Sequence, residues 1–317
     1  MDRAGLRIAA PVSLTALAER HGGQVDAEAG PIVIRRIAPL DAGEASDLCP
    51  LMSRRHLEVA RASRAALLVD AHLAEHLAPG RRWVHSHAAW ALAGILSDLE
   101  PARESDRRAD AIVEPGAEIA ADVCIGPGAV IMAGARIGAG SVIEPNAVIY
   151  PRVWMGERVR IGASAVIGRP GFGWAKGPDD QLRRIPQLGG VVIEDDVEVG
   201  PLATVDAGTL GPTIVRRGVR LDAHVHVGHN VQMGPGTLVA AQSGFAGSVR
   251  IGAGVRVGGQ AGVADHVRIG DGAEIAAKAG VIGDIAGGMR VAGYPALDRI
   301  RWLKGVARMV RRGKADK

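Results

Sequence analysis

The stretch Ile119-Ala-Ala-Asp-Val-Cys-Ile125-Gly-Pro-Gly-Ala-Val-Ile131-Met-Ala-Gly-Ala-Arg-Ile137 places an apolar residue at every sixth position. The same spacing runs from residue 113 to 167, returns between 193 and 205, and runs again from 215 to 281. Four positions after most of these apolar residues stands a small or β-branched residue. A period of six fits neither an α-helix, whose apolar residues lie three and four apart, nor an ordinary long strand. It is typical of a β-solenoid in which each hexapeptide forms one short strand and one corner.

Three hexapeptides complete one coil of 18 residues, so the apolar residue of each period points into a triangular prism. Stacked coils then bury a continuous column of aliphatic side chains, each of which contributes roughly 1.5–3 kcal/mol on burial. This core needs no aromatic residues, in keeping with an aromatic content of 3%. At the corners we expect glycine or Asn, because a Cβ hinders the backbone conformations required there. The sequence therefore predicts a mainly β, parallel β-helix domain over residues 106–296.

Two insertions break the period. Residues 169–190 form a loop too long for a corner, and residues 206–213 form a shorter irregular segment. The longer loop contains Gly171-Phe-Gly-Trp174 and Arg184-Ile-Pro-Gln187. Long loops that leave a rigid scaffold are common binding elements. We therefore expect the longer loop to contact a ligand.

The N-terminal residues 1–105 lack the period and predict a small α/β domain. The polar stretch 100–110 is typical of a linker to the solenoid. The expected elements are a helix that Ser13 caps and that stops at Gly22-Gly23, strands at 31–37 and 65–69, and a helix at 87–99.

The chain is mildly basic. Its 317 residues carry a formal net charge of +4, and basic residues concentrate in a predicted C-terminal helix over 297–317. This charge suits an acidic partner, but a solvated basic surface or a helix that packs on a neighbouring subunit are the alternatives. Nothing in the composition indicates a nucleic-acid partner.

The cysteine usage and the hydropathy bear on the cellular compartment. Cys49 and Cys124 lie in unrelated contexts and form no metal-spaced pair, which favours a reducing cytosol. No segment shows the pattern of a signal peptide, and no stretch supplies eighteen uninterrupted apolar residues. We therefore expect a cytoplasmic protein without stable membrane insertion.

Two histidines project from the predicted solenoid wall. His229 follows the inward-pointing Val227 by two residues, and His266 follows Val263 by three. The histidines are 37 residues apart, so two coils separate them on nearly the same edge of the prism. A neutral imidazole in a cleft accepts a proton near pH 7 and can act as a general base. The alternative is a surface or interface histidine that makes one hydrogen bond.

A metal site is a second reading of the histidines. The spacing of His224 and His229 resembles part of the zinc site of γ-class carbonic anhydrases, which share this solenoid. Those enzymes need a third histidine about two coils earlier, where this chain has Gln187 and Leu188. Because two histidines make a poor zinc site, we expect no bound metal.

The order of an α/β domain, a hexapeptide solenoid and a C-terminal helix resembles the UDP-3-O-acylglucosamine N-acyltransferase family of lipid A biosynthesis over nearly the whole chain. The hexapeptide repeat alone is unspecific, since many acyltransferases and acetyltransferases have it. The more specific motifs are Gly171-Phe-Gly-Trp174, Arg184-Ile-Pro-Gln-Leu-Gly189, Gly228-His-Asn-Val231, Asp265-His-Val267 and Gly293-Tyr-Pro295.

The resemblance implies a left-handed coil and a homotrimer with active sites in clefts between subunits. It places His229 on the general base, His266 on the second active-site histidine and Gly247 on the glycine whose N–H holds the oxyanion. Asp222 matches a carboxylate that orients the base. The implied acyl donor is an acyl carrier protein with its phosphopantetheine arm, with no bound cofactor, and the acceptor is a UDP-sugar lipid precursor.

Further roles carry over from the same motifs. The implied substrate contacts are Asn230, Gln187, Phe172, Gly173 and Trp174. Because carrier protein is acidic, the basic C-terminal helix becomes its docking surface through Arg299, Arg301, Lys304 and Arg308.

The chain departs from the family pattern at three places. Residues 47–56 contain no aromatic residue, whereas the family holds the uracil between two. We expect Arg54, Arg55 and His56 to contact a phosphate or to stack on a base instead. Ala207 stands where the family has an Arg after its Asp, and the helical tail is shorter. Two alternatives stay open: a nucleotide-sugar N-acetyltransferase that uses acetyl-CoA, and a catalytically idle trimeric scaffold.

Overall fold

The structure is a computed structural model that describes residues 5–99, 110–178 and 180–315, with side chains up to residue 308. The chain divides into two compact units, Met1–Ala102 and Arg103–Lys317. The predicted linker and the predicted boundary at residue 105 fall within 100–109, outside the described residues.

The N-terminal unit is a mixed sheet in the order β1-β3-β4-β5-β6-β2. Strands β3 to β6 run parallel, and β1 and β2 pair antiparallel at the two edges. The strands are β1 Leu6–Ser13, β2 Gln24–Val25, β3 Val33–Ile37, β4 Asp47–Leu51, β5 Ala66–Asp70 and β6 Arg82–His85. The α-helices are α1 Leu14–His21, α2 Leu57–Ala62, α3 Ala71–Ala74 and α4 Ala88–Leu99, with 3₁₀ turns at Ala27–Ala29, Leu40–Ala42 and Arg54–His56.

The predicted elements of this unit are confirmed to within two residues. The Ser13 side chain accepts a hydrogen bond from the Ala16 N–H at 3.0 Å, which caps α1. The helix stops at Gly22, whose φ of +85° is unfavourable for a residue with a Cβ. Trp83 on β6 is fully buried in the core between the sheet and α4.

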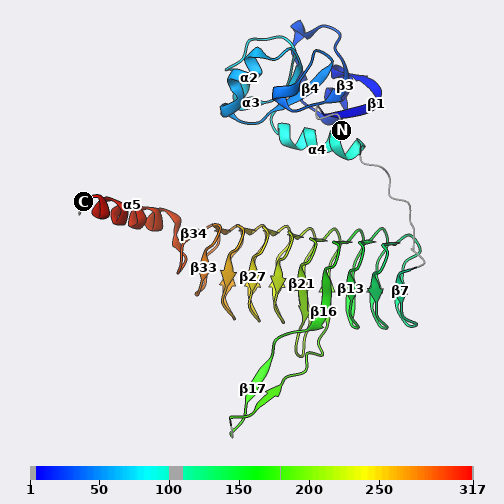
Figure 1. Cartoon of the computed structure of the whole chain (residues 1–317), viewed down its shortest axis with the longest axis vertical. Helices are drawn as coiled ribbons and strands as arrows, with labels where there is room; N and C mark the ends of the chain where they lie inside the picture. The colour runs from blue at the N-terminus through cyan, green and yellow to red at the C-terminus, as the bar shows by residue number, and fades with distance from the viewer. Residues whose placement is uncertain (1–4, 100–109, 179, 316–317) are drawn as a thin grey trace. The chain divides into compact units, whose positions relative to one another are not determined.

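The second unit is a triangular prism with three sheets of parallel strands, apart from one antiparallel pair at the end of the third sheet. Figure 1 shows its coils stacked one after another. The first face contains β7 Ile112–Val113, β10 Val130–Ile131, β13 Val148–Ile149, β16 Val166–Pro170, β21 Thr204–Ala207, β24 His226–Val227, β27 Gly244–Phe245, β30 Gly262–Val263 and β33 Gly280–Val281. The second face contains β8 Glu118–Ile119, β11 Arg136–Ile137, β14 Val153–Met155, β19 Val191–Ile193, β22 Thr213–Val215, β25 Gln232–Met233, β28 Arg250–Ile251 and β31 Arg268–Ile269. The third face contains β9 Cys124–Ile125, β12 Val142–Ile143, β15 Arg160–Ile161, β20 Glu198–Val199, β23 Arg220–Leu221, β26 Leu238–Val239, β29 Arg256–Val257, β32 Glu274–Ile275, β34 Arg290–Ala292 and β35 Leu297–Asp298.

The six-residue period builds one continuous apolar column. From Ile125 to Val281 the residues of the period are buried in a single cluster, together with small corner residues such as Ala129 and Ala135. Val113 and Ile119 are the exceptions: 41% of the Val113 surface is exposed, and Ile119 is only partly buried against the cluster. Both belong to the first coil, which has a neighbouring coil on one side only. The predicted β-helix is therefore confirmed.

The corners contain many residues with a left-handed backbone, and not only glycine or Asn. Arg158, Leu202, His224 and Lys278 all have φ near +60°. This conformation costs an L-residue roughly 1–2 kcal/mol. Many corners recover a hydrogen bond to the preceding coil, as when the Arg158 N–H donates to the Ala139 carbonyl at 2.8 Å. Glycine and Asn occupy several corners, as expected, but other residues adopt the same backbone where the stacked coils hold it in place.

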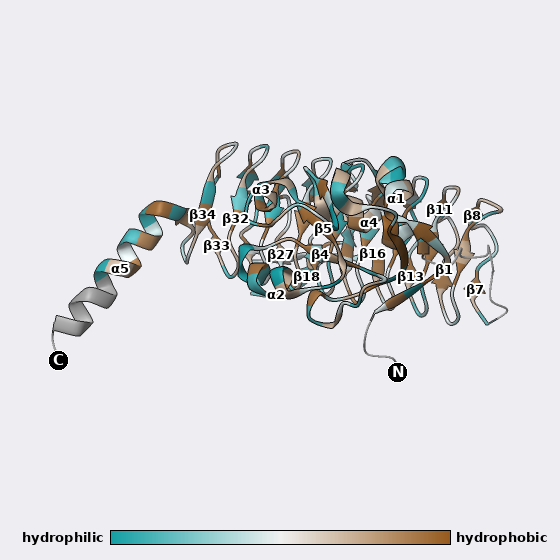
Figure 2. Ribbon diagram, turned by 90° about the horizontal axis from the view of Figure 1, so that it is seen from above, coloured by the Kyte–Doolittle hydropathy of each residue, from teal (hydrophilic) through white to brown (hydrophobic). Residues whose placement is uncertain are grey.

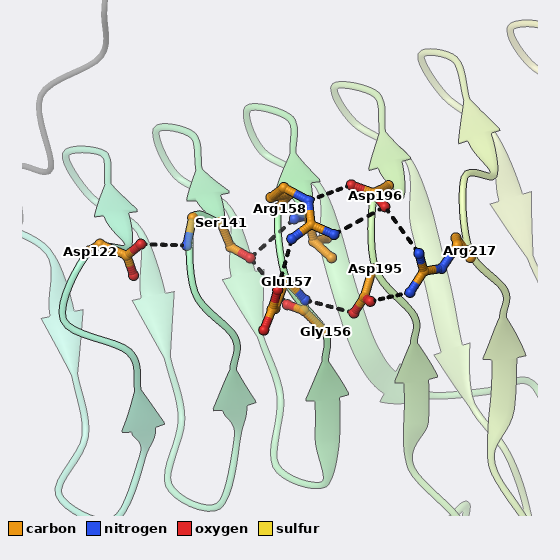
Figure 3. A network of polar contacts seen from close by, with 10 residues as sticks. Asp122, Ser141, Gly156, Glu157, Arg158, Asp195, Asp196 and Arg217 are labelled. Carbon is orange, nitrogen blue, oxygen red and sulfur yellow. Dashed lines mark hydrogen bonds and ion pairs between the residues drawn. The ribbon is translucent and has the colours of Figure 1, made fainter.

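An ion-pair ladder follows the corner between the second and third faces (Figure 3). Arg158 donates to both carboxylate oxygens of Asp196, at 2.6 and 3.2 Å, and Arg217 pairs with Asp195 at 2.6 Å. Arg158 and Asp196 lie on adjacent coils although 38 residues separate them in sequence. The ladder therefore joins the coils between which the loop 169–190 is inserted.

We expect acid to remove the contribution of this ladder to stability. The Arg158 side chain lowers the pKa of Asp196 below its ordinary value. The Asp196–Arg158 pair therefore stabilises the fold above the unfolded-state pKa of about 3.9 and loses that effect as the pH falls through the lower folded value. The check is the urea midpoint of wild type and Asp196→Asn at pH 7 and pH 3: the gap between the two proteins should shrink at pH 3. An equal gap at both pH values would contradict the role of the pair.

The loop 169–190 forms an antiparallel hairpin of β17 Trp174–Lys176 and β18 Leu182–Arg184, with Trp174 opposite Arg184. Figure 1 shows the hairpin projecting from the prism beside β16 and β21. Its root is bound to the solenoid, because the Gly189 N–H donates to the Gly208 carbonyl at 2.8 Å and the Gly208 N–H donates to the Gly190 carbonyl at 3.0 Å.

The C-terminal helix α5 spans Arg299–Ala315 and contacts β34 and β35. It starts two residues later than predicted, because Leu297 and Asp298 form β35 and Asp298 caps the helix through the Arg301 N–H at 3.0 Å. In Figure 2 its first turns alternate between hydrophilic and hydrophobic residues. Across the described residues, no helix has both the length and the hydropathy that a membrane span requires.

Candidate functional site

The candidate site lies on the corner between the first and second faces. His229 and Asn230 form this corner after β24, Gly247 and Ser248 form it one coil later, and His266 lies on it two coils later. Parallel strands are about 4.8 Å apart, so His229 and His266 are separated by about 10 Å along the prism. The prediction that the two histidines share an edge is confirmed.

The His229 ring lies directly over Gly247. A Cβ added to Gly247 would come within 2.5 Å of the His229 Cε1 atom and 2.6 Å of its Nε2 atom. Real Cβ atoms do not approach other atoms this closely, so glycine is required here for steric reasons. The structure thus brings together the two residues that the resemblance pairs as base and oxyanion donor.

Asn230 determines which nitrogen of His229 carries the proton. The Asn230 Nδ2 group donates to the Gly211 carbonyl at 2.9 Å, which fixes the orientation of the amide. The Asn230 Oδ1 atom therefore faces the His229 Nδ1 atom, 3.1 Å away. An amide oxygen only accepts hydrogen bonds, so in the neutral ring Nδ1 is protonated and Nε2 keeps its lone pair. The Cε1–Nε2 edge of the ring, which includes this nitrogen, is the edge nearest to Gly247.

The Gly247 N–H is open to a ligand because of the residue below it. At other corners a carboxylate on the preceding coil accepts the equivalent N–H: Glu114 from Ala133, Glu144 from Ala163, Glu194 from Arg217 and Asp222 from Ala241, at 2.8 to 3.2 Å. The equivalent residue below Gly247 is Gly228, which has no side chain. Within the described residues the Gly247 N–H has no acceptor.

Asn230 is also linked to the loop 169–190. The Thr209 N–H donates to the Asn230 Oδ1 atom at 3.0 Å, and the Thr209 hydroxyl donates to the Gln187 Oε1 atom at 2.8 Å. Gln187 is buried, and its amide donates to the Ile185 carbonyl at 3.0 Å. Asn230 and Gln187, predicted as substrate contacts, thus have polar partners within the chain. The sequence did not predict that Thr209 belongs to the site, because the insertion 206–213 has no six-residue period from which its position could be inferred.

We expect the loss of the Asn230 amide to lower kcat about 10- to 100-fold, because His229 then has no fixed tautomer. The variant is Asn230→Ala, and the measurement is kcat and KM for acyl transfer. Asn146→Ala is the matched control, because Asn146 has the same left-handed backbone, with φ of +60°, on another corner. Equal losses in both variants would attribute the effect to backbone strain and contradict the role in the tautomer.

Asp206 is a buried carboxylate below His229 that sequence reasoning did not assign to the site. Only 1% of its surface is exposed, and it pairs with Arg169 at 2.9 Å and faces His226 at 3.8 Å. Burial raises the pKa of Asp206, against the opposing effect of the charges on His226 and Arg169. A Cβ on Gly171 would lie 2.8 Å from the His229 Cβ and 3.4 Å from the Asp206 Cβ. Gly171 thus fits between the two residues, and the Arg169–Asp206 pair holds the root of the hairpin.

The structure does not bring Asp222 to His229 within one chain. Asp222 follows β23 and lies on the corner between the third and first faces. Its two oxygens accept the backbone N–H groups of Ala223 and Ala241, at 2.7 and 3.1 Å. In one chain Asn230, and not Asp222, orients the His229 ring. His224 lies on the same corner as Asp222, away from His229. The described residues contain no group of three or more His, Cys, Asp or Glu arranged to hold a metal ion.

The remaining predicted residues lie on the projecting segments. Gly173 is close to Gln187, since a Cβ there would lie 2.7 Å from the Gln187 Nε2 atom. Phe172 and Trp174 are exposed near the start of the hairpin, at 81% and 49%. The four basic side chains of α5, namely Arg299, Arg301, Lys304 and Arg308, are all exposed.

Comparisons with known proteins agree with this architecture. Residues 134–169 match the family model "Bacterial transferase hexapeptide (six repeats)". The UDP-3-O-acylglucosamine N-acyltransferase of Anaeromyxobacter dehalogenans strain 2CP-C is 38% identical over 75% of this chain and 74% of its own length. The protein of the same name from Rhizobium meliloti strain 1021 is 36% identical over 95% of this chain and 93% of its own length.

A solved structure of similar fold is the UDP-N-acetylglucosamine acyltransferase from Campylobacter jejuni. Its TM-score is 0.56 at 27% identity, over 61% of this chain and 73% of that chain. The prism of this protein is the left-handed parallel β-helix of that neighbour. The sequence matches over 75% and 95% of the chain, together with the shared solenoid fold, lead to one conclusion: the chain belongs to the UDP-3-O-acylglucosamine N-acyltransferase family and is an acyltransferase.

Proposed function

We propose that this enzyme transfers a hydroxyacyl chain from acyl carrier protein to the 2-amine of UDP-3-O-acylglucosamine in lipid A biosynthesis, with His229 as the general base. The observation that carries this proposal is the pairing of the His229 Nε2 lone pair with the unoccupied N–H of Gly247. The base and the oxyanion donor of an acyl transfer must flank one reacting carbon.

The chemistry follows from this arrangement. The sugar amine attacks the thioester carbonyl, a C–N bond forms, and His229 accepts the proton that the nitrogen loses. The Gly247 N–H holds the oxyanion of the tetrahedral intermediate. The C–S bond then breaks, and His229 returns its proton to the leaving thiolate of the phosphopantetheine arm.

Three further features belong to the proposal. The enzyme acts as a homotrimer in the cytoplasm, and its active site lies between subunits. In this arrangement Asp222 of one chain approaches His229 of another. The exposed basic side chains of α5 attract the acidic carrier protein. The exposed Phe172 and Trp174 of the hairpin contact the lipid precursor.

The test is product analysis with a panel of acyl donors. The enzyme is incubated with UDP-3-O-acylglucosamine and either hydroxyacyl carrier proteins of different chain length or acetyl-CoA, and the products are weighed by mass spectrometry. We expect one added acyl chain on nitrogen from a carrier thioester and none from acetyl-CoA. Product from acetyl-CoA alone would make the enzyme an N-acetyltransferase, and no product from any donor would reject acyl transfer to this acceptor.

A further inference from the structure

A cavity opens on the second face of the prism beside the His229 corner. Its lining includes Asn230, Ser248 and His266 from the corner and Arg250 and Arg268 from the face. These residues come from successive coils, so they form two short columns that run along the prism from the level of Asn230.

Arg250 and Arg268 are direct neighbours with the same charge. They are register partners on β28 and β31, whose backbones are about 4.8 Å apart. Like charges in facing positions of a sheet destabilise it. Several other arginines on the prism pair with a carboxylate on an adjacent coil, as Arg136 pairs with Glu118 at 3.1 Å on the same face.

Within the described residues, neither Arg250 nor Arg268 forms an ion pair. The Arg250 guanidinium has one long contact with Gln232, at 3.4 Å. Asp284 is the carboxylate near Arg268, and it accepts the backbone N–H of Arg268 at 2.7 Å. Arg250 and Arg268 therefore line the same cavity from adjacent strands, and neither side chain pairs with a carboxylate among the described residues.

We propose that Arg250 and Arg268, together with His266, bind a phosphate group of a substrate that reacts at His229. This inference rests on the proposed function and specifies the chemistry of one of its substrates. A guanidinium donates two parallel hydrogen bonds to phosphate oxygens, and a bound phosphate offsets the repulsion between two such groups. The phosphate belongs either to the phosphopantetheine arm of the donor or to the diphosphate of the nucleotide sugar.

The experiment is calorimetric titration of the full-length enzyme with four ligands: 4′-phosphopantetheine, pantetheine, UDP and uridine. Arg250→Gln and Arg268→Gln should each lower the affinity for one phosphate-bearing ligand about 10- to 100-fold, as expected for the loss of a hydrogen bond to a charged group. Its phosphate-free counterpart should bind to the variants as it binds to wild type. The phosphate-bearing ligand whose affinity falls in the two variants identifies the source of the phosphate.

Arg136→Gln is the matched control, because Arg136 occupies the same strand position on the same face but pairs with Glu118. The inference is overturned if neither phosphate-bearing ligand binds wild type, or if both arginine variants bind like the control. Binding is measured without turnover, so its outcome is separate from that of the donor panel. If the enzyme binds the phosphate through both arginines but forms no N-acylated product, the phosphate subsite is supported and the proposed reaction is rejected.

Discussion

Replacement of His229 by Ala lowers kcat for acyl transfer by about 10²–10⁴-fold, the usual contribution of a positioned general base. The Nε2 atom of His229 is the one nitrogen in the corner with a free lone pair beside the Gly247 N–H. Without it, the attacking amine must lose its proton to water. KM changes little, because the imidazole acts mainly in the transition state. The measurement is steady-state kinetics with the carrier thioester and UDP-3-O-acylglucosamine.

The matched control is His224→Asn, which removes a histidine from a neighbouring corner of the prism while keeping a residue that tolerates the left-handed backbone there. Urea unfolding should give the same midpoint for wild type and His229→Ala, since the His229 side chain is outside the apolar column. Full activity of His229→Ala would rule out His229 as the base. A large drop in its unfolding midpoint would instead assign the loss of activity to misfolding.

Substitution of Gly247 by Ala should lower kcat by about 10²–10⁴-fold, the scale of losing a positioned general base, because Ala keeps the backbone N–H but displaces the His229 ring. The added methyl group would lie 2.5 Å from the His229 ring, so the ring must move. The backbone itself tolerates Ala, because Gly247 does not have a positive φ. Stability should therefore fall much less than activity, which kinetics and urea unfolding measure together.

A double-mutant cycle separates the two effects of this methyl group. In the His229→Ala background the ring is absent, so Gly247→Ala should cost little further activity. Gly283→Ala is the control, because Gly283 occupies the same corner position two coils farther on and has no atom within 4 Å of its added Cβ. If the losses from Gly247→Ala and His229→Ala multiply fully, then the ring and the glycine act independently, contrary to the packing seen here.

The sequence predicted the architecture because the period of six leaves no freedom of register. Each coil of 18 residues stacks the apolar residue of one period on that of the next coil, as Ile131 pairs with Ile149 and Val227 with Phe245. The shared edge of His229 and His266 follows from this arithmetic alone. The family resemblance then supplied roles for these residues that no spacing reveals.

The contacts around His229 were beyond prediction for a physical reason. Thr209, Gly211 and Gln187 belong to insertions without a period, so only their packing decides that they surround Asn230. The Gly247 N–H was equally hidden, since its freedom depends on the missing side chain of Gly228 one coil away.

The sequence by itself determined the prism, its coil register and the edge on which the two histidines stand, because a six-residue period permits one way of burying its apolar residues. Only the tertiary structure decided which nitrogen of His229 is protonated, that Asp206 is buried beneath it, and that Asp222 binds backbone N–H groups at another corner. Hydrogen bonds of this kind join atoms whose separation in space is unrelated to their separation in sequence.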